Sequence, residues 1–174
     1  ALLKAHQGIF ARSRVEIFPD DREARQLAEN FLAASLPLFE AVEQQIVKMQ
    51  QEISRRRLVP EDSPSTEELR SLQRLLKRDW GIALLELSQV VSDEGRKRLL
   101  ITDGESKFRE LARPDDADNL AEQAQLWLLK SARLRQDYDQ VSKALIAFDS
   151  GDYSDAVRDQ VMIERIRAAL ELKK

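Results

Sequence analysis

A regular hydrophobic repeat over residues 115–149 constrains the fold of this chain more than any other feature of the sequence. Small and apolar side chains recur there in alternating steps of four and three, at Leu120, Ala124, Trp127, Ser131, Leu134, Tyr138, Val141, Leu145 and Phe148. Such a 3.5-residue repeat places one stripe on one helix face, as in a left-handed coiled coil or a helical bundle. Further apolar residues beside the stripe favour the bundle, so we predict one long helix here.

Three other segments carry a helical pattern. Apolar residues recur in steps of three or four over 19–58, 65–91 and 152–173, where we expect the other main helices. Ser65 followed by Glu68 matches the capping box that begins a helix. In the last segment the predicted core face consists of Ala156, Ile163, Ile166 and Leu170.

The remaining segments are less regular. Residues 1–18 fit a short helix or an extended arm, and residues 92–114 predict an irregular connection with at most a short helix. Pro37 predicts a kink or a break near residues 33–37, because proline removes a helical hydrogen bond. We therefore predict a single all-α domain over residues 1–174. It would be an elongated antiparallel bundle of about four long amphipathic helices plus one or two short ones.

The amino-acid composition favours long helices and excludes several classes of binding or catalytic site. Only five glycines and five prolines occur in 174 residues, which favours long regular elements. No cysteine is present, which excludes disulfides, zinc–thiolate sites and cysteine nucleophiles. We find no transmembrane segment and no signal peptide, and we predict a cytoplasmic protein. Since the chain begins with Ala1 rather than Met, we interpret it as a processed product or as a fragment of a larger protein, and we favour the fragment.

One local resemblance to a known family occurs near the C-terminus. The run Ala-Phe-Asp-Ser-Gly-Asp-Tyr-Ser-Asp-Ala over residues 147–156 resembles the turn between the two helices of a tetratricopeptide repeat. Residues 168–172 resemble the end of the second helix of that repeat. No second copy is visible, so the resemblance implies a helical hairpin with the same turn chemistry rather than an array of repeats.

Familiar catalytic and metal-binding patterns are missing. Neither G-x-x-x-x-G-K-[ST] nor G-x-G-x-x-G occurs, and His6 is the only histidine. A di-iron bundle or a serine triad would need more histidines or a better-placed one. The acidic run that begins at Asp115 fails the EF-hand template, which requires glycine where Leu120 stands and glutamate where Leu126 stands. We therefore predict no cofactor, no metal site and no enzymatic activity.

A non-catalytic interaction or scaffold module is the function that the sequence favours. Its partner would be another protein or a second copy of the chain, and the candidate contact residues are Trp80, Trp127, Arg55, Arg56 and Arg57. The two tryptophans also fit core positions on the predicted stripes, and the three arginines also fit a helix end, where cations are favourable.

The alternative function is a basic module that binds nucleic acid or an anionic membrane. Besides the arginines at 55–57, basic residues cluster at 77–78, at 96–98 and at 133 and 135. The overall net charge of −3 gives no general attraction to polyanions, so such binding would need several clusters on one face.

Overall fold

The computed structural model describes residues 1–55, 63–112 and 119–173. These residues form seven α-helices and no strand, which confirms the all-α class. The helices are α1 (Leu2–Ile17), α2 (Arg22–Arg55), α3 (Thr66–Ser88), α4 (Glu94–Leu111), α5 (Asn119–Leu134), α6 (Tyr138–Ser150) and α7 (Asp155–Glu171). Among them, none combines the length and the apolarity needed to cross a membrane.

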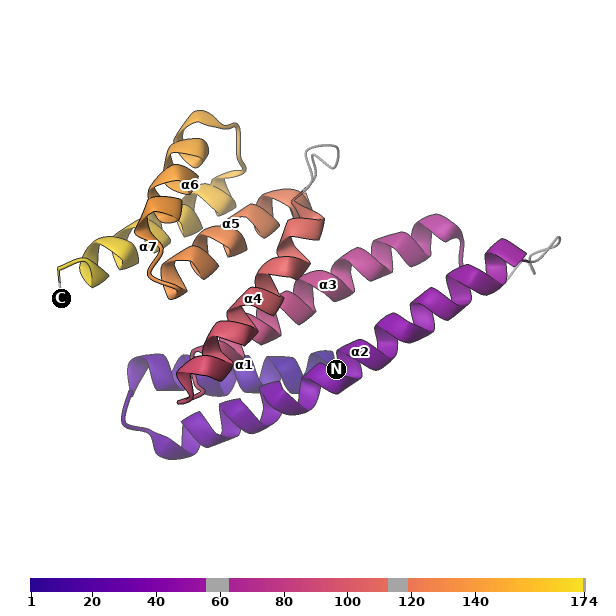
Figure 1. Cartoon of the computed structure of the whole chain (residues 1–174), viewed down its shortest axis with the longest axis horizontal. Helices are drawn as coiled ribbons and strands as arrows, with labels where there is room; N and C mark the ends of the chain where they lie inside the picture. The colour runs from indigo at the N-terminus through magenta and orange to yellow at the C-terminus, as the bar shows by residue number, and fades with distance from the viewer. Residues whose placement is uncertain (56–62, 113–118, 174) are drawn as a thin grey trace.

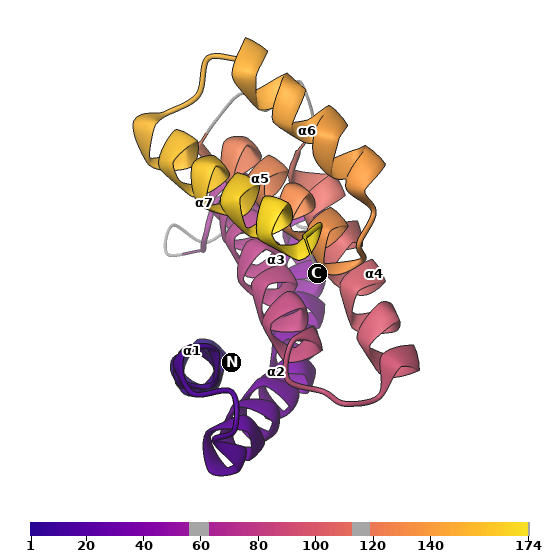
Figure 2. The ribbon, with the colours of Figure 1, turned by 90° about the vertical axis from the view of Figure 1, so that its left-hand side faces the viewer.

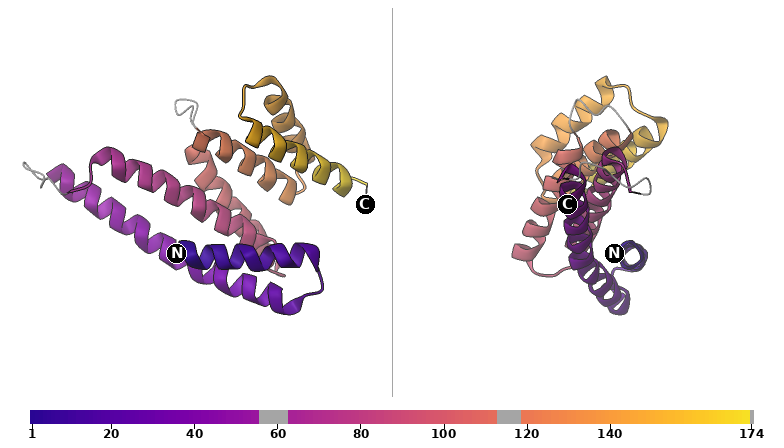
Figure 3. Two further views of the ribbon diagram at one scale, coloured as in Figure 1. Left: turned by 180° about the vertical axis from the view of Figure 1, so that it is seen from behind. Right: turned by 90° about the vertical axis from the view of Figure 1, so that its right-hand side faces the viewer.

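The helices alternate between two layers (Figures 1 and 2). Each helix packs against the next, and α1, α3, α5 and α7 also contact one another in succession; we call these four the odd layer. The backbones of α2, α4 and α6, the even layer, do not approach one another within the described residues. The molecule is therefore an open stack, with α1 beside α2 at one end and α6 and α7 at the other (Figure 3).

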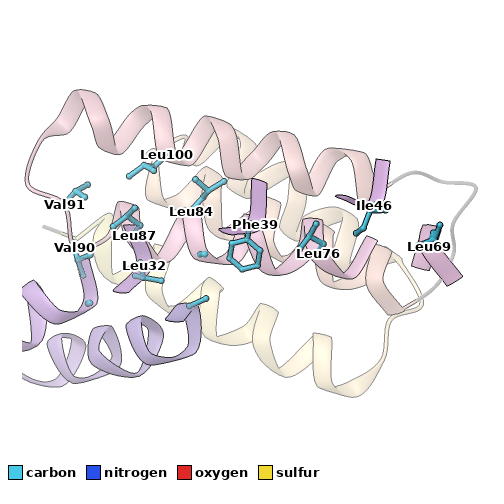
Figure 4. Close-up of a cluster of buried hydrophobic side chains, with 13 residues drawn as sticks. Leu32, Phe39, Ile46, Leu69, Leu76, Leu84, Leu87, Val90, Val91 and Leu100 are labelled. Carbon is cyan, nitrogen blue, oxygen red and sulfur yellow. The ribbon is translucent and has the colours of Figure 1, made fainter. Parts of the chain in front are cut away.

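The first core cluster joins the helices of the N-terminal half. Figure 4 shows Leu32, Phe39 and Ile46 of α2 among leucines of α3, with Val90 and Val91 of the following connection and Leu100 of α4 beside them. Glycines bring some helices unusually close, because a Cβ atom at Gly8 would lie 2.5 Å from Cγ of Leu32. Separate clusters hold α4 against α5 and hold α5 against α6 and α7.

Side-chain caps fix where several helices begin. The predicted capping box is present: Ser65 Oγ accepts from the Glu68 N–H at 3.1 Å, and the Ser65 N–H donates to Glu68 at 2.7 Å. The hydrogen bonds from the Ser65 backbone and side chain lower the pKa of Glu68. Asp93 accepts from the Arg96 N–H at 2.6 Å and begins α4, and Asp137 caps α6 in the same way.

Two predictions about helix boundaries are wrong. The long helix predicted over 115–149 is divided into α5 and α6, and Gln136 in the connection has a φ of 60°. The hydrophobic steps continue across this connection, so counting them cannot reveal the turn. Residues 92–114 contain the 18-residue helix α4 rather than an irregular connection. Together these changes account for seven helices instead of the expected four long and one or two short ones.

The structure also tests the predictions for residues 1–18 and for Pro37. Of the two alternatives for residues 1–18, the helix is correct, since α1 extends over 16 residues. The break considered at residues 33–37 does not occur, because α2 continues through Pro37. Leu32, Ser35 and Phe39 around the proline are fully buried, and this packing holds the helix together despite the lost hydrogen bond.

Candidate interaction surfaces

The Trp80 ring contacts side chains from two neighbouring helices of its own chain. Its ring stacks on Phe39 of α2 with 6.3 Å between ring centroids and 10° between planes. The Lys107 Nζ of α4 lies 3.9 Å from the Trp80 ring centroid. Trp80 is half-buried and lines a cleft between α2 and α4.

Trp127 has a closely similar environment. It stacks on Phe108 of α4 with centroids 5.8 Å apart and planes at 7°, and the Lys130 Nζ lies 4.4 Å from the ring centroid. Because both tryptophans hold neighbouring helices together, they contribute to packing within the chain. Their role as contact residues for a partner stays a prediction.

The predicted basic residues are only partly described. Arg55 is exposed and is the last residue of α2, whereas Arg56 and Arg57 lie outside the described residues. Two other basic clusters, far apart in sequence, do meet: Lys97 and Arg98 line a pocket of about 470 Å³ together with Arg135.

Carboxylates reduce the positive charge of this basic pocket. Glu94 lines it and lies 3.5 Å from the Lys97 Nζ. Arg135 lies 3.0 Å from a carboxylate oxygen of the buried Glu105. Arg98, which is exposed like Arg135, forms no ion pair within the part of the chain that is described.

Ion pairs connect all four helices of the odd layer. Glu86 of α3 is buried and pairs with Arg12 of α1 and, at 2.7 Å, with Lys130 of α5. Arg133 of α5 pairs with Glu164 of α7 at 2.6 Å. Sequence patterns did not reveal this network, because its members lie on four helices and follow no common spacing.

Arg133 carries the most perturbed charge of the network. Burial lowers the pKa of its guanidinium, but the nearby carboxylates of Glu164 and Glu171 outweigh this effect and raise the pKa. The side chain of Glu164 is only 7% exposed and also accepts from Arg167 at 2.9 Å. The network therefore holds α5 and α7 together, and its buried carboxylates are already occupied by cations.

Two clefts open between the helices of the even layer. One of about 530 Å³ lies between α2 and α4, and Trp80 and Leu84 of α3 contribute to its lining. The other, of about 510 Å³, lies between α4 and α6 and is lined by Leu128 and Leu129 of α5. Both sizes are typical of ligand sites, and each lining mixes apolar and charged side chains.

The two end helices expose apolar stripes. Leu3, Phe10 and Ile17 form the outer stripe of α1, and their exposed fractions are 72%, 80% and 70%. The outer stripe of α7 consists of Met162, Ile163, Ile166, Ala169 and Leu170, all exposed. The prediction that Ala156, Ile163, Ile166 and Leu170 form the core face of the last helix is wrong, since α7 buries Val157, Val161, Glu164 and Ala168 instead.

No candidate metal site emerges from the described residues. They contain no group of three or more histidine, aspartate or glutamate side chains placed to hold a metal ion. Comparisons of the chain with protein-family models, with curated proteins and with solved structures gave no match. The exposed stripes, the clefts and the basic pocket are thus the features on which a function can be argued.

Proposed function

We propose that this chain is a non-catalytic helical interaction module that docks a partner protein on the outer stripe of α1. The observation that carries the proposal is the seven-residue spacing of Leu3, Phe10 and Ile17, three large apolar side chains that are each at least 70% exposed. Repetition every seven residues aligns them along one side of a helix. Aligned, exposed apolar side chains are typical of surfaces that bind other proteins.

The opposite face of α1 keeps the outer stripe in place. The buried residues of α1 are Ala5, Gly8 and Val15. The close approach of Gly8 to Leu32 fixes the side of α1 that faces α2. Arg12 adds an ion pair with the buried Glu86 of α3. Because the helix is already ordered, binding would cost little conformational entropy, which favours affinity.

An amphipathic helix is the partner that this surface fits. A row of apolar side chains one heptad apart can pack against a helix that carries apolar residues at spacings of three, four and seven. Gln7 and Arg14 are exposed between the members of the stripe, so the partner would need polar groups at matching positions. In this proposal the helices α2 to α7 serve as the scaffold that presents α1.

The test compares three immobilised forms of the whole chain: wild type, Phe10→Asp, and Ile166→Asp as a matched control at the opposite end. Lysate is passed over each, followed by washes at low and at high salt, and retained proteins are identified by mass spectrometry. We expect a protein that survives high salt on wild type and on Ile166→Asp and is lost on Phe10→Asp. If no retained protein depends on Phe10, the proposal is wrong.

A second candidate function rests on the basic pocket of Lys97, Arg98 and Arg135. The convergence of two sequence-distant clusters favours binding of a phosphate-rich surface, either nucleic acid or an anionic membrane. Such binding should fall steeply between about 50 and 200 mM salt and should weaken in Arg98→Glu. Apolar docking on α1 should change little over the same range, so binding of DNA and of phosphatidylserine vesicles measured at both salt concentrations separates the two functions.

A further inference from the structure

Helix α7 turns its more hydrophobic face away from the rest of the molecule. Met162, Ile163, Ile166 and Leu170 are between 40% and 58% exposed. The face that α7 packs against α5 and α6 is weaker, since it contains the charged Glu164 besides valines and alanine. A helix normally buries its most apolar face, so this arrangement indicates that the outer stripe of α7 is covered by another surface.

Two opposite charges bracket the outer stripe of α7. Asp159 precedes Ile166 by seven residues and lies about 10 Å from it along the same side of α7, and Lys173 follows Ile166 by seven, two residues past the last helical residue Glu171. Both side chains are exposed, and neither forms an ion pair within residues 1–55, 63–112 and 119–173. The stripe is thus apolar at its centre, acidic at one end and basic at the other.

We propose that two copies of this chain associate through α7, with the two helices antiparallel and crossing at Ile166. In this arrangement Met162 lies opposite Leu170 of the second copy, and Ile166 lies opposite its equivalent. Asp159 then faces Lys173 of the second copy, and the twofold symmetry forms this pair twice. A parallel arrangement would instead place Asp159 against Asp159 and Lys173 against Lys173, which is unfavourable.

Arginines beside the stripe do not oppose this contact. Arg165 lies 2.6 Å from Asp149 of α6, and Arg158 lies 3.3 Å from Asp152. Each is therefore paired with a carboxylate of its own copy. The charges nearest the two ends of the stripe are Asp159 and Lys173, and a second α7 in the antiparallel direction matches both; Asp155, one turn before Asp159, is also exposed and without an ion pair among the described residues.

This inference goes beyond the proposed function and is independent of it. Figure 2 shows α7 at the end of the stack away from α1 and α2. Docking on the outer stripe of α1 concerns a different protein and a different helix, which α7 meets only through the side-chain contact of Arg167 with Glu16 among the described residues. Either proposal can therefore fail while the other holds, and Phe10→Asp serves as the control here.

Sedimentation of the whole chain over a range of concentrations tests the proposal. A single helix pair is a small interface, so we expect a dimer with a dissociation constant in roughly the micromolar range. Ile166→Asp would place two carboxylates together at the crossing point and should weaken the dimer about a hundredfold or more. Phe10→Asp should leave the dimer unchanged, and circular dichroism checks that both variants keep their helical content.

A charge exchange tests the antiparallel direction. Asp159→Lys and Lys173→Asp, each alone, convert two attractive pairs into repulsive ones and should weaken the dimer about tenfold. The double variant restores opposite charges and should dimerise nearly as well as wild type. A wild-type chain that stays monomeric, a dimer that tolerates Ile166→Asp, or a double variant that does not recover would each overturn the proposal.

Discussion

Arg167 of α7 donates a hydrogen bond of 2.6 Å to Glu16 of α1, although 151 residues separate them in the sequence. The backbones of α1 and α7 do not approach each other within the described residues, so the two ends of the odd layer meet through long side chains. Arg12 joins Glu16 to the network at 3.1 Å, and Glu164 joins Arg167 to it. The ion pairs of the odd layer therefore reach from its first helix to its last.

Position within this network should determine how much each arginine stabilises the fold. Arg133→Ala would leave the buried Glu164 with less compensation, so we expect the free energy of unfolding to fall by about 3 kcal/mol. Arg167→Ala breaks pairs that are partly screened by water and should cost less than about 1 kcal/mol. Urea denaturation of both variants checks this order, and equal losses would contradict it.

A side chain at Gly81 should lower the stability of the fold. A Cβ atom there would lie 2.6 Å from the Phe108 Cζ, so Gly81→Ala forces α3 and α4 apart. We expect a loss of about 1 kcal/mol, because crowding of about 1–3 kcal/mol exceeds the gain in helix propensity. Gly95→Ala is the matched control, since its nearest contact would be 3.4 Å from Asp93, and it should be neutral or slightly stabilising in thermal unfolding.

Replacing Pro37 should stabilise α2. Pro37→Ala restores an N–H to the interior of a continuous helix at an exposed position. The helical gain of about 3 kcal/mol is reduced by about 1 kcal/mol, because proline also restricts the unfolded chain. We expect the free energy of unfolding in urea to rise by about 2 kcal/mol, and a decrease would show that the proline ring itself is needed in the cleft that it lines.

The capping box should make the stability of α3 depend on pH. Hydrogen bonds from Ser65 lower the pKa of Glu68 in the folded chain, so folding favours the ionised carboxylate. This contribution is complete at neutral pH and is lost as the pH falls through the lowered pKa. The difference in melting temperature between wild type and Glu68→Ala should therefore shrink in acid. Glu67→Ala, outside the capping box, should show a weaker dependence.

The turn between α5 and α6 stores strain at Gln136. Its φ of 60° lies in the left-handed region, which costs most residues about 1–2 kcal/mol but costs glycine little. Gln136→Gly should raise the free energy of unfolding by up to about 1 kcal/mol, whereas Gln136→Val should lower it. Chemical denaturation of both variants measures the effect, and a loss of stability in Gln136→Gly would contradict this account.

The limits of the sequence analysis can be traced to particular residues. Helical spacing correctly indicated an all-α chain, and Ser65 with Glu68 correctly located the start of α3. The helix α4 was not predicted as one element because Thr102, Asp103 and Gly104 resemble a turn, whereas Gly104 lies on the buried face of a continuous helix. That glycine is buried against Leu85, where a Cβ atom would lie 3.1 Å from Cδ2. A glycine at a helix contact therefore interrupts the hydrophobic spacing by which a helix is predicted from sequence.

The candidate surfaces were less predictable for a different reason. Periodicity shows that Ile163, Ile166 and Leu170 share a face of α7, but it does not show which of two faces the fold buries. Here the ion pair between Arg133 and Glu164 lies on the buried face, and a charged residue in a core cannot be anticipated from hydrophobic spacing. In α1, too, hydrophobic spacing does not show whether the regular apolar stripe faces the core or the solvent.

The stepwise packing of the two layers has a consequence for how the chain folds. Close backbone contacts join each helix only to helices one or two places away in sequence. Ordering any adjacent pair thus closes only a short loop of chain, and structure can spread from there in both directions. Amide protons in α1 and α7 should exchange with solvent sooner than those of α3, which has neighbours on both sides, so the molecule would fray inward from its two ends.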